Sequence, residues 1–169
     1  MGRTQWLTES ELAAWQPIAE LLLVLPSHLE EPLHAHGLTF FDYTVLVVLS
    51  HAEDRTMPMS TLAHLASGSL SRTSHRARRL EQRDLLRRHP CPDDRRVTLV
   101  TMTDTGYQTL TDAAPSHVES VRRSVFDPLT SQQSVELGRL ATTILEHITP
   151  NSPWVKAAAS RRGRENRPN

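Results

Sequence analysis

Apolar residues recur at helical spacing close to both ends of the chain. In the N-terminal part they are Leu12, Trp15, Ala19, Leu22 and Leu23, and this spacing is typical of one face of an α-helix. Thr8 and Glu11 stand at the spacing of a capping box. The pattern therefore predicts a first helix from about residue 9 to the region of Pro32, where the proline ring kinks or ends it.

The C-terminal part predicts two more long helices. The fifth helix along the chain begins after Thr103 and covers about residues 104–126, and Pro115 should bend it without necessarily ending it. The sixth begins after the capping-box pair Thr130 and Gln133, and its apolar stripe is Val135, Leu137, Leu140, Ile144, Leu145 and Ile148. These helices have more apolar face than a small domain of about 70 residues can cover, so we expect burial against a second copy.

The middle of the chain predicts shorter helices followed by a hairpin. The nearly apolar run FDYTVLVVLSHA follows Thr39 and predicts a buried second helix, STLAHLA after Pro58 predicts a third, and a fourth covers about residues 69–83. A short glycine-containing turn at 67–69 joins the third and fourth helices, so these two helices are predicted to form a helix-turn-helix. Strand-like segments at 85–89 and 97–101 flank a polar tip and predict a wing. The fold class is mainly α (α+β): a winged helix-turn-helix domain with dimerisation helices at both ends.

Charge is separated along the chain, although the formal net charge is zero. Residues 69–96 contain nine arginines and four acids, whereas residues 1–58 contain eight acids and only Arg3 and Arg55 as basic residues. A polyanion responds to the local field rather than to the mean charge. The segment 69–96 is therefore the candidate surface for an anionic partner.

The fourth helix and the wing have the side chains that DNA recognition uses. An inward stripe of Leu70, Thr73, Ala77 and Leu80 leaves hydroxyls, an imidazole and guanidinium groups on the outward faces, from Ser71, Arg72, Ser74, His75, Arg76 and Arg79. Arginine can donate two hydrogen bonds to guanine, and serine or histidine can bond other base edges. Arginines of the wing suit the negative potential of the minor groove. A neighbouring carboxylate can hold such a guanidinium in one orientation.

Several short motifs carry a family resemblance. They are Leu62-Ala63, Ser74-His75, Arg79-Leu80-Glu81, the Asp94-x-Arg96 wing motif and Thr103-x-x-Gly106. In this order and spacing the chain resembles the MarR family of bacterial winged-helix regulators over nearly all of residues 8–148. One departure is Asp84, where the family usually has glycine after the recognition helix. Aspartate tolerates a left-handed backbone better than most residues, so we expect the turn to survive.

The resemblance implies a homodimer joined through the first, fifth and sixth helices, with the fourth helix in the major groove and the wing in the adjacent minor groove. The predicted DNA-binding residues are Ser69, Ser71, Arg72, Ser74, His75, Arg76, Asp94, Arg95 and Arg96, with Asp94 orienting Arg96. The expected organisation is a single MarR-type unit over 1–150, with the winged helix-turn-helix at 39–102 and dimerisation helices at 8–36 and 103–148. The tail 151–169 has no apolar periodicity and is predicted to be disordered.

We therefore expect a sequence-specific DNA-binding transcriptional regulator, a ligand-responsive repressor and not an enzyme, that binds a pseudo-palindromic operator in double-stranded DNA as a homodimer. On family grounds a small-molecule effector is expected in the crevice between the dimerisation helices and the winged domain. Its contacts stay open, although Trp15, His34, His36, Phe40 and His117 could approach that crevice. No cofactor is expected. The apolar run at 21–25 is too short to span a membrane, no secretion signal is expected, and the single cysteine suits a reducing cytoplasm.

Other interpretations remain open. One is a winged-helix dimer that docks an acidic protein through the same arginines, and another is a zinc- or redox-responsive member of the family. The candidate zinc ligands His28, Glu30, Glu31, His34, His36, His117 and Glu119 have no spacing that fixes a ligand set. Basic neighbours favour the thiolate of Cys91, but oxidation-sensing relatives have their cysteine in the first helix. Ser71, His75 and Asp94 lack the nucleophile elbow and oxyanion loop of a hydrolase.

Overall fold

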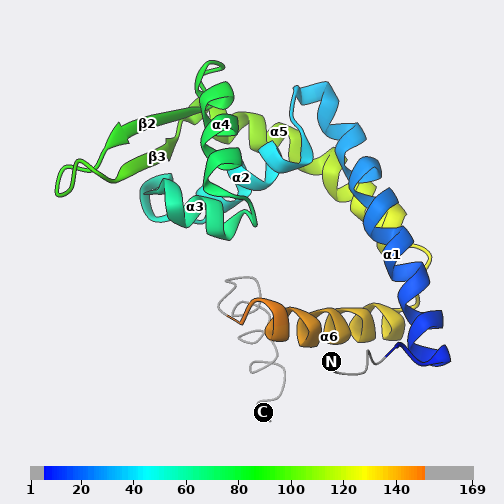
Figure 1. The fold of residues 1–169 in the computed structure, drawn as a ribbon. Coiled ribbons are helices and arrows are strands. Elements are labelled where there is room, and N and C mark those ends of the chain that lie inside the picture. The colour runs from blue at the N-terminus through cyan, green and yellow to red at the C-terminus, as the bar shows by residue number, and fades with distance from the viewer. Residues whose placement is uncertain (1–5, 151–169) are drawn as a thin grey trace, which may run out of the picture.

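The computed structural model describes residues 6–150 (Figure 1). The predicted tail 151–169 lies outside the described residues. The elements in chain order are α1 (Glu9–Glu30), the 3-10 helix η1 (Glu31–His36), α2 (Phe40–Ser50), the 3-10 turn η2 (Glu53–Arg55), β1 (Thr56–Pro58), α3 (Met59–Leu65), α4 (Leu70–Glu81), β2 (Leu86–Pro90), β3 (Thr98–Met102), α5 (Asp104–Val121), the π-helical turn η3 (Arg122–Phe126) and α6 (Ser131–Ile148). The mainly helical winged helix-turn-helix fold with long flanking helices is confirmed.

The helix limits follow the local signals in the sequence. Both capping boxes that begin α1 and α6 are present, and the backbone N–H of Thr8 donates to Glu11 Oε2 at 2.7 Å. At Pro32 the α-helical hydrogen bonding gives way to η1, which ends at Gly37 in the left-handed conformation (φ 66°). Pro115 lies inside α5 and does not end it. The predicted helix at 104–126 is therefore continuous, although its last turn is π-helical.

The sheet has three antiparallel strands in the order β1-β3-β2. Thr56 pairs with Thr101 across β1 and β3, and Leu86 pairs with Met102 across β2 and β3. Both wing strands begin one residue later than the sequence predicts. The strand β1 was not predicted, because three residues ending in proline are shorter than the usual strand signal and proline is tolerated only at a sheet edge.

The core lies where the helix-turn-helix packs on the base of the wing. The second helix is buried as predicted, and Leu46, Leu49, Leu62, Leu80 and Leu86 are at most 1% exposed. The first turn of α5 approaches the end of this core closely. A Cβ on Gly106 would lie 2.2 Å from the carbonyl oxygen of Leu85, so this position accepts only glycine without a backbone shift.

The long helices extend away from the core. In Figure 1 the wing projects to one side, α1 and α5 lie side by side on the other, and α6 turns back beneath them. Ser120 in α5 donates to the carbonyl oxygen of His28 in α1 at 2.9 Å, and this contact ties the two helices together.

The apolar faces of the outer helices are exposed. No residue of α1 or α6 is buried by the described part of the chain, and Leu22, Leu23 and Val135 are 64%, 79% and 75% exposed. The continuous helical stretch Glu9–His36 is long and apolar enough, by length and composition, to cross a membrane. The apolar run at 21–25, taken alone, was too short to indicate a helix of membrane-spanning length. An exposed apolar face of this size indicates an interaction site, where another molecule covers the apolar side chains.

Candidate nucleic-acid interface

The helix α4 begins at a side-chain cap. The hydroxyl oxygen of Ser69 accepts a hydrogen bond from the backbone N–H of Arg72 at 3.2 Å, which satisfies one of the free donors of the first turn. Thr73, Ala77 and Leu80 are buried as predicted. Leu70 is 54% exposed, so its predicted place in the inward stripe is wrong. As the first residue of the helix, it lies beyond the edge of the core.

One face of α4 is open to solvent. Ser71 and His75 are exposed and Ser74 is half-buried, as expected for a surface that meets a base edge. Arg78 is exposed on this same face, and no ion pair or side-chain hydrogen bond involves it within residues 6–150. Arg78 was not among the predicted DNA-binding residues, although its spacing of three and four from His75 and Ser74 places it on their face.

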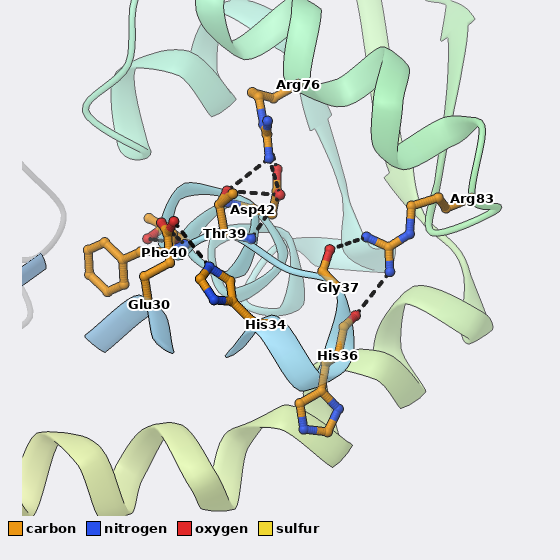
Figure 2. Close-up of polar contacts among 10 residues, drawn as sticks. Glu30, His34, His36, Gly37, Thr39, Phe40, Asp42, Arg76 and Arg83 are labelled. Atoms are coloured by element: carbon orange, nitrogen blue, oxygen red, sulfur yellow. Dashed lines mark hydrogen bonds and ion pairs between the residues drawn. The ribbon is translucent and has the colours of Figure 1, made fainter. Parts of the chain in front are cut away.

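The prediction that Arg76 faces outward is wrong. Its side chain is only 20% exposed, because the guanidinium turns inward and forms an ion pair with Asp42 of α2 (Figure 2). Its Nε donates to Asp42 Oδ1 at 2.8 Å and its Nη2 donates to Thr39 Oγ1 at 2.9 Å. Asp42 also closes the capping box of α2. The outward prediction failed because the acid that binds Arg76 lies 34 residues away, outside any local pattern.

Arg72 lies at the edge of the open face. Its guanidinium carbon is 4.6 Å from the centre of the Phe41 ring, a cation–π distance. The stem of the side chain is thus supported by α2 while the residue as a whole remains exposed. This contact limits the directions in which Arg72 can reach a ligand or a phosphate.

The wing presents one oriented and one free arginine. Arg96 donates from Nε to Asp94 Oδ1 at 3.1 Å and from Nη2 to Oδ2 at 3.2 Å, so the predicted pairing is present. Hydrogen bonds from the side chain and the backbone of Arg96 lower the pKa of Asp94. The Arg96 side chain is 92% exposed. Arg95 is exposed, and no side-chain partner lies near it in the part of the chain that the structure describes.

Other arginines of the segment 69–96 support the fold. Arg88 donates from its backbone N–H and from its guanidinium to Glu81, with Nη2 to Oε2 at 2.6 Å, which joins β2 to the end of α4. Arg83 donates to two backbone carbonyls of the segment before α2. Between them, Asp84 has φ 56°, the left-handed conformation expected at this glycine position. Only part of the charge in this segment is therefore free to meet a partner.

A cavity of about 780 Å³ opens beside the helix-turn-helix. Phe40, Phe41, Tyr43, His117, Arg72 and Arg76 are among its lining residues. The structure thus places two of the residues expected near an effector, Phe40 and His117, at this cavity. Trp15, His34 and His36, which were expected there as well, are not among its lining residues. The His34 ring instead points toward Glu30, which does line the cavity (Figure 2).

His117 is a titratable residue of this cavity whose pKa is shifted by burial. Burial lowers its pKa, against a smaller opposing effect of a hydrogen bond with the backbone of Leu29. Its ring centre lies 4.4 Å from that of Tyr43. Its Nδ1 is buried and has no hydrogen-bond partner among the described residues.

The proposed metal and redox groups are dispersed. Within residues 6–150 no group of three histidine, cysteine or acidic side chains is arranged to hold a metal ion. Glu30 instead accepts a hydrogen bond from the backbone N–H of Phe40 at 2.8 Å and lies 3.5 Å from His34 Nε2 (Figure 2). Cys91 is half-buried at the wing tip, where its backbone N–H donates to Val97.

The helix-turn-helix, the exposed face of α4 and the arginine-bearing wing define a winged helix-turn-helix DNA-binding protein. A protein-family sequence model described as "MarR family" matches residues 38–98. The chain is 30% identical to the HTH-type transcriptional regulator MhqR of Bacillus subtilis over 149 residues, which are 86% of this chain and 96% of that protein. It therefore belongs to the MarR family, whose members regulate transcription and are not enzymes.

Solved structures agree with this assignment. AbsC, a MarR family transcriptional regulator from Streptomyces coelicolor, is 40% identical with a TM-score of 0.80, and the alignment covers 88% of this chain and 100% of AbsC. Sco3205 from the same organism, also a MarR family regulator, was solved in complex with DNA. It is 36% identical with a TM-score of 0.82, over 88% of this chain and 94% of Sco3205.

Proposed function

We propose that this chain binds a pseudo-palindromic operator in double-stranded DNA as a homodimer and acts as a ligand-responsive repressor. The observation that carries the proposal is the open face of α4, where Ser71, His75 and Arg78 are exposed together on a helix held firmly by its opposite face. The related regulator Sco3205 was solved with DNA, and a similar surface here suits the same partner.

Each structural part has a role in this proposal. The helix α4 enters the major groove, where Ser71, Ser74, His75 and Arg78 meet base edges, while Arg95 and Arg96 of the wing reach the adjacent minor groove. Arg76 serves inside the protein and not at the DNA, because its guanidinium already binds Asp42. Ser69 serves mainly as the helix cap.

The dimer is supported by the exposed apolar faces of α1 and α6. Leu22, Leu23 and Val135 are among several large apolar side chains that the described chain leaves in solvent. A second copy would cover them and would set two α4 helices about 34 Å apart, one turn of DNA. We assign residues 8–36 and 103–148 to this interface and residues 39–102 to DNA binding. This role also implies a cytoplasmic location.

The response to a ligand is supported by the cavity beside α4. A volume of about 780 Å³ lies in the range of small-molecule sites. Its aromatic walls and its arginines suit a small aromatic compound with an acidic group. Arg72 and Arg76 belong both to α4 and to the wall of the cavity. A ligand that draws on these guanidinium groups would change the position of α4 and thereby release the operator.

Selection of binding sites from random duplex DNA at about 150 mM salt, an ionic strength at which nonspecific phosphate contacts are weakened, tests the proposal. We expect an enriched inverted repeat with half-sites one helical turn apart. Variants Arg78→Ala and His75→Ala should change the preferred bases, whereas Arg79→Ala, which removes an exposed arginine of α4 that is not placed at a base edge, serves as the matched control. Weak binding without sequence preference, with and without aromatic acids, would favour a protein-interaction module instead.

A further inference from the structure

Two arginines fasten the recognition helix to one short segment of the chain. Arg76 binds Asp42 and Thr39, and Arg83, just beyond the end of α4, binds the carbonyls before Thr39 (Figure 2). Both attachments meet the segment 36–42, where the chain passes from the dimerisation helix α1 and η1 into α2. The helix α4 is therefore linked directly to the point at which the dimerisation region enters the winged domain.

The contact of Arg83 has the geometry of a helix cap supplied from a distant part of the chain. Its Nη1 donates to the carbonyl oxygen of Gly37 at 2.6 Å, and its Nη2 donates to that of His36 at 3.0 Å. These carbonyls lie at the C-terminal end of η1, where backbone acceptors lack partners within the helix and the helix dipole attracts a cation. The planar guanidinium reaches both at once, which the single ammonium group of a lysine does less well.

The contacts of Arg76 and Arg83 together constrain the orientation of α4 more than either contact does alone. Thr73, Ala77 and Leu80 pack the inner face of α4 into the core, and one further polar contact restricts mainly the part of the helix nearest to it. Arg76 and Arg83 are seven positions apart, which corresponds to roughly 10 Å along a helix axis. A pair of contacts at this separation fixes the angle of the helix as well as its position. The angle of α4 relative to the dimerisation region determines the distance between the recognition helices of two protomers.

We propose that Arg83 is a positioning residue for DNA recognition: it holds the C-terminal end of α4 against the carbonyls of His36 and Gly37, and so sets the half-site spacing that the dimer accepts. The inference rests on the proposed operator binding and deepens it. Arg76 borders the ligand cavity, whereas Arg83 is not among the residues that line it. Arg83 therefore remains in place when a ligand perturbs Arg76, and α4 pivots about it.

The first test uses full-length protein and a set of operators whose half-sites are moved together or apart by single base pairs. We expect Arg83→Ala to bind the best operator about tenfold more weakly, the effect of one lost charge-assisted contact, and to discriminate less between spacings. Arg83→Lys should recover part of this discrimination. The matched control is Arg79→Ala, which removes an exposed arginine of α4 that makes no side-chain hydrogen bond or ion pair within the described residues, and it should affect all spacings equally.

The second test measures the geometry without DNA. A single spin label on each protomer, introduced by His75→Cys in a Cys91→Ser background, reports the distance between the two α4 helices. Arg83→Ala should broaden the distance distribution, and Arg79→Ala should not. An unchanged distribution, or equal weakening at every spacing, would overturn the inference even if the wild type binds its operator. A monomeric chain would overturn it too, because no spacing would then exist to be set.

Discussion

Removal of the Asp42 carboxylate should be among the most destabilising single changes in the winged domain. Asp42 is 3% exposed and accepts hydrogen bonds from Arg76 and from both the backbone N–H and the hydroxyl of Thr39. Asp42→Ala leaves the guanidinium of Arg76 without its partner in a site where that side chain is 20% exposed. Breaking a buried pair costs about 3–5 kcal/mol, and partial exposure of the arginine favours the lower end.

The loss of the capping box adds to this cost. The capping contact contributes about 1 kcal/mol, so the free energy of unfolding should fall by about 4 kcal/mol in total. The double variant Asp42→Ala, Arg76→Leu removes the unpaired charge as well and should regain more than half of the loss, since apolar replacements of buried ion pairs are often well tolerated. Asp104→Ala is the matched control. Its carboxylate is 97% exposed and pairs with Arg55, so the change should be below about 1 kcal/mol.

Urea unfolding at one fixed protein concentration measures these differences, because the stability of the proposed dimer would depend on concentration. The slope of the unfolding free energy against urea should stay constant among the variants, as expected when only the native contacts change. If Asp42→Ala costs no more than Asp104→Ala, the buried pair does not stabilise the domain. If the double variant is no more stable than Asp42→Ala alone, the cost does not come from the unpaired guanidinium of Arg76.

Three further outcomes are expected. Arg96→Ala should weaken operator binding and reduce the slope of log affinity against log salt by about one unit, and an unchanged slope in filter-binding assays would remove Arg96 from the interface. Gly106→Ala should lower the melting temperature because its Cβ would lie 2.2 Å from a carbonyl oxygen. Gly138→Ala, whose Cβ would meet no atom of its own protomer within 4 Å, should avoid such a clash and gain about 0.5–1 kcal/mol of helix propensity. Burial lowers the pKa of His117 below the ordinary 6.5, so its contribution to stability is present above about pH 6.5 and is lost as the pH falls through the folded-state pKa. His117→Phe should make urea stability less dependent on pH over this window, and an equal dependence in both proteins would show that another group titrates there.

The helices were predictable because their signals are local. Capping residues such as Thr8 and Thr130, together with apolar spacing, fix where a helix begins and which face it buries. The left-handed turn at Asp84 also followed from its place after the recognition helix. The edge strand β1 was missed because its pairing with β3 depends on contacts between residues about 45 positions apart, such as Thr56 and Thr101.

The candidate site was less predictable, for the same reason. Spacing along α4 separates inward from outward positions, but it does not show which outward arginine finds a distant acid. Arg76 was expected to be free and is bound by Asp42, whereas Arg78 was overlooked and is exposed. Arg83 likewise reaches carbonyls that lie more than 40 positions away. Assigning charges to partners requires the tertiary structure.

The bare apolar face of α1 has a consequence for how the protein is made. This helix is translated before the other described elements, and the described part of its own chain does not bury it. Roughly 120 residues separate its end from the end of α6, which at about 5–20 residues per second takes roughly 6–24 seconds to translate. In the proposed homodimer only a second copy covers this face, so it would be covered soonest when two ribosomes on one messenger RNA release neighbouring copies that associate where they are made.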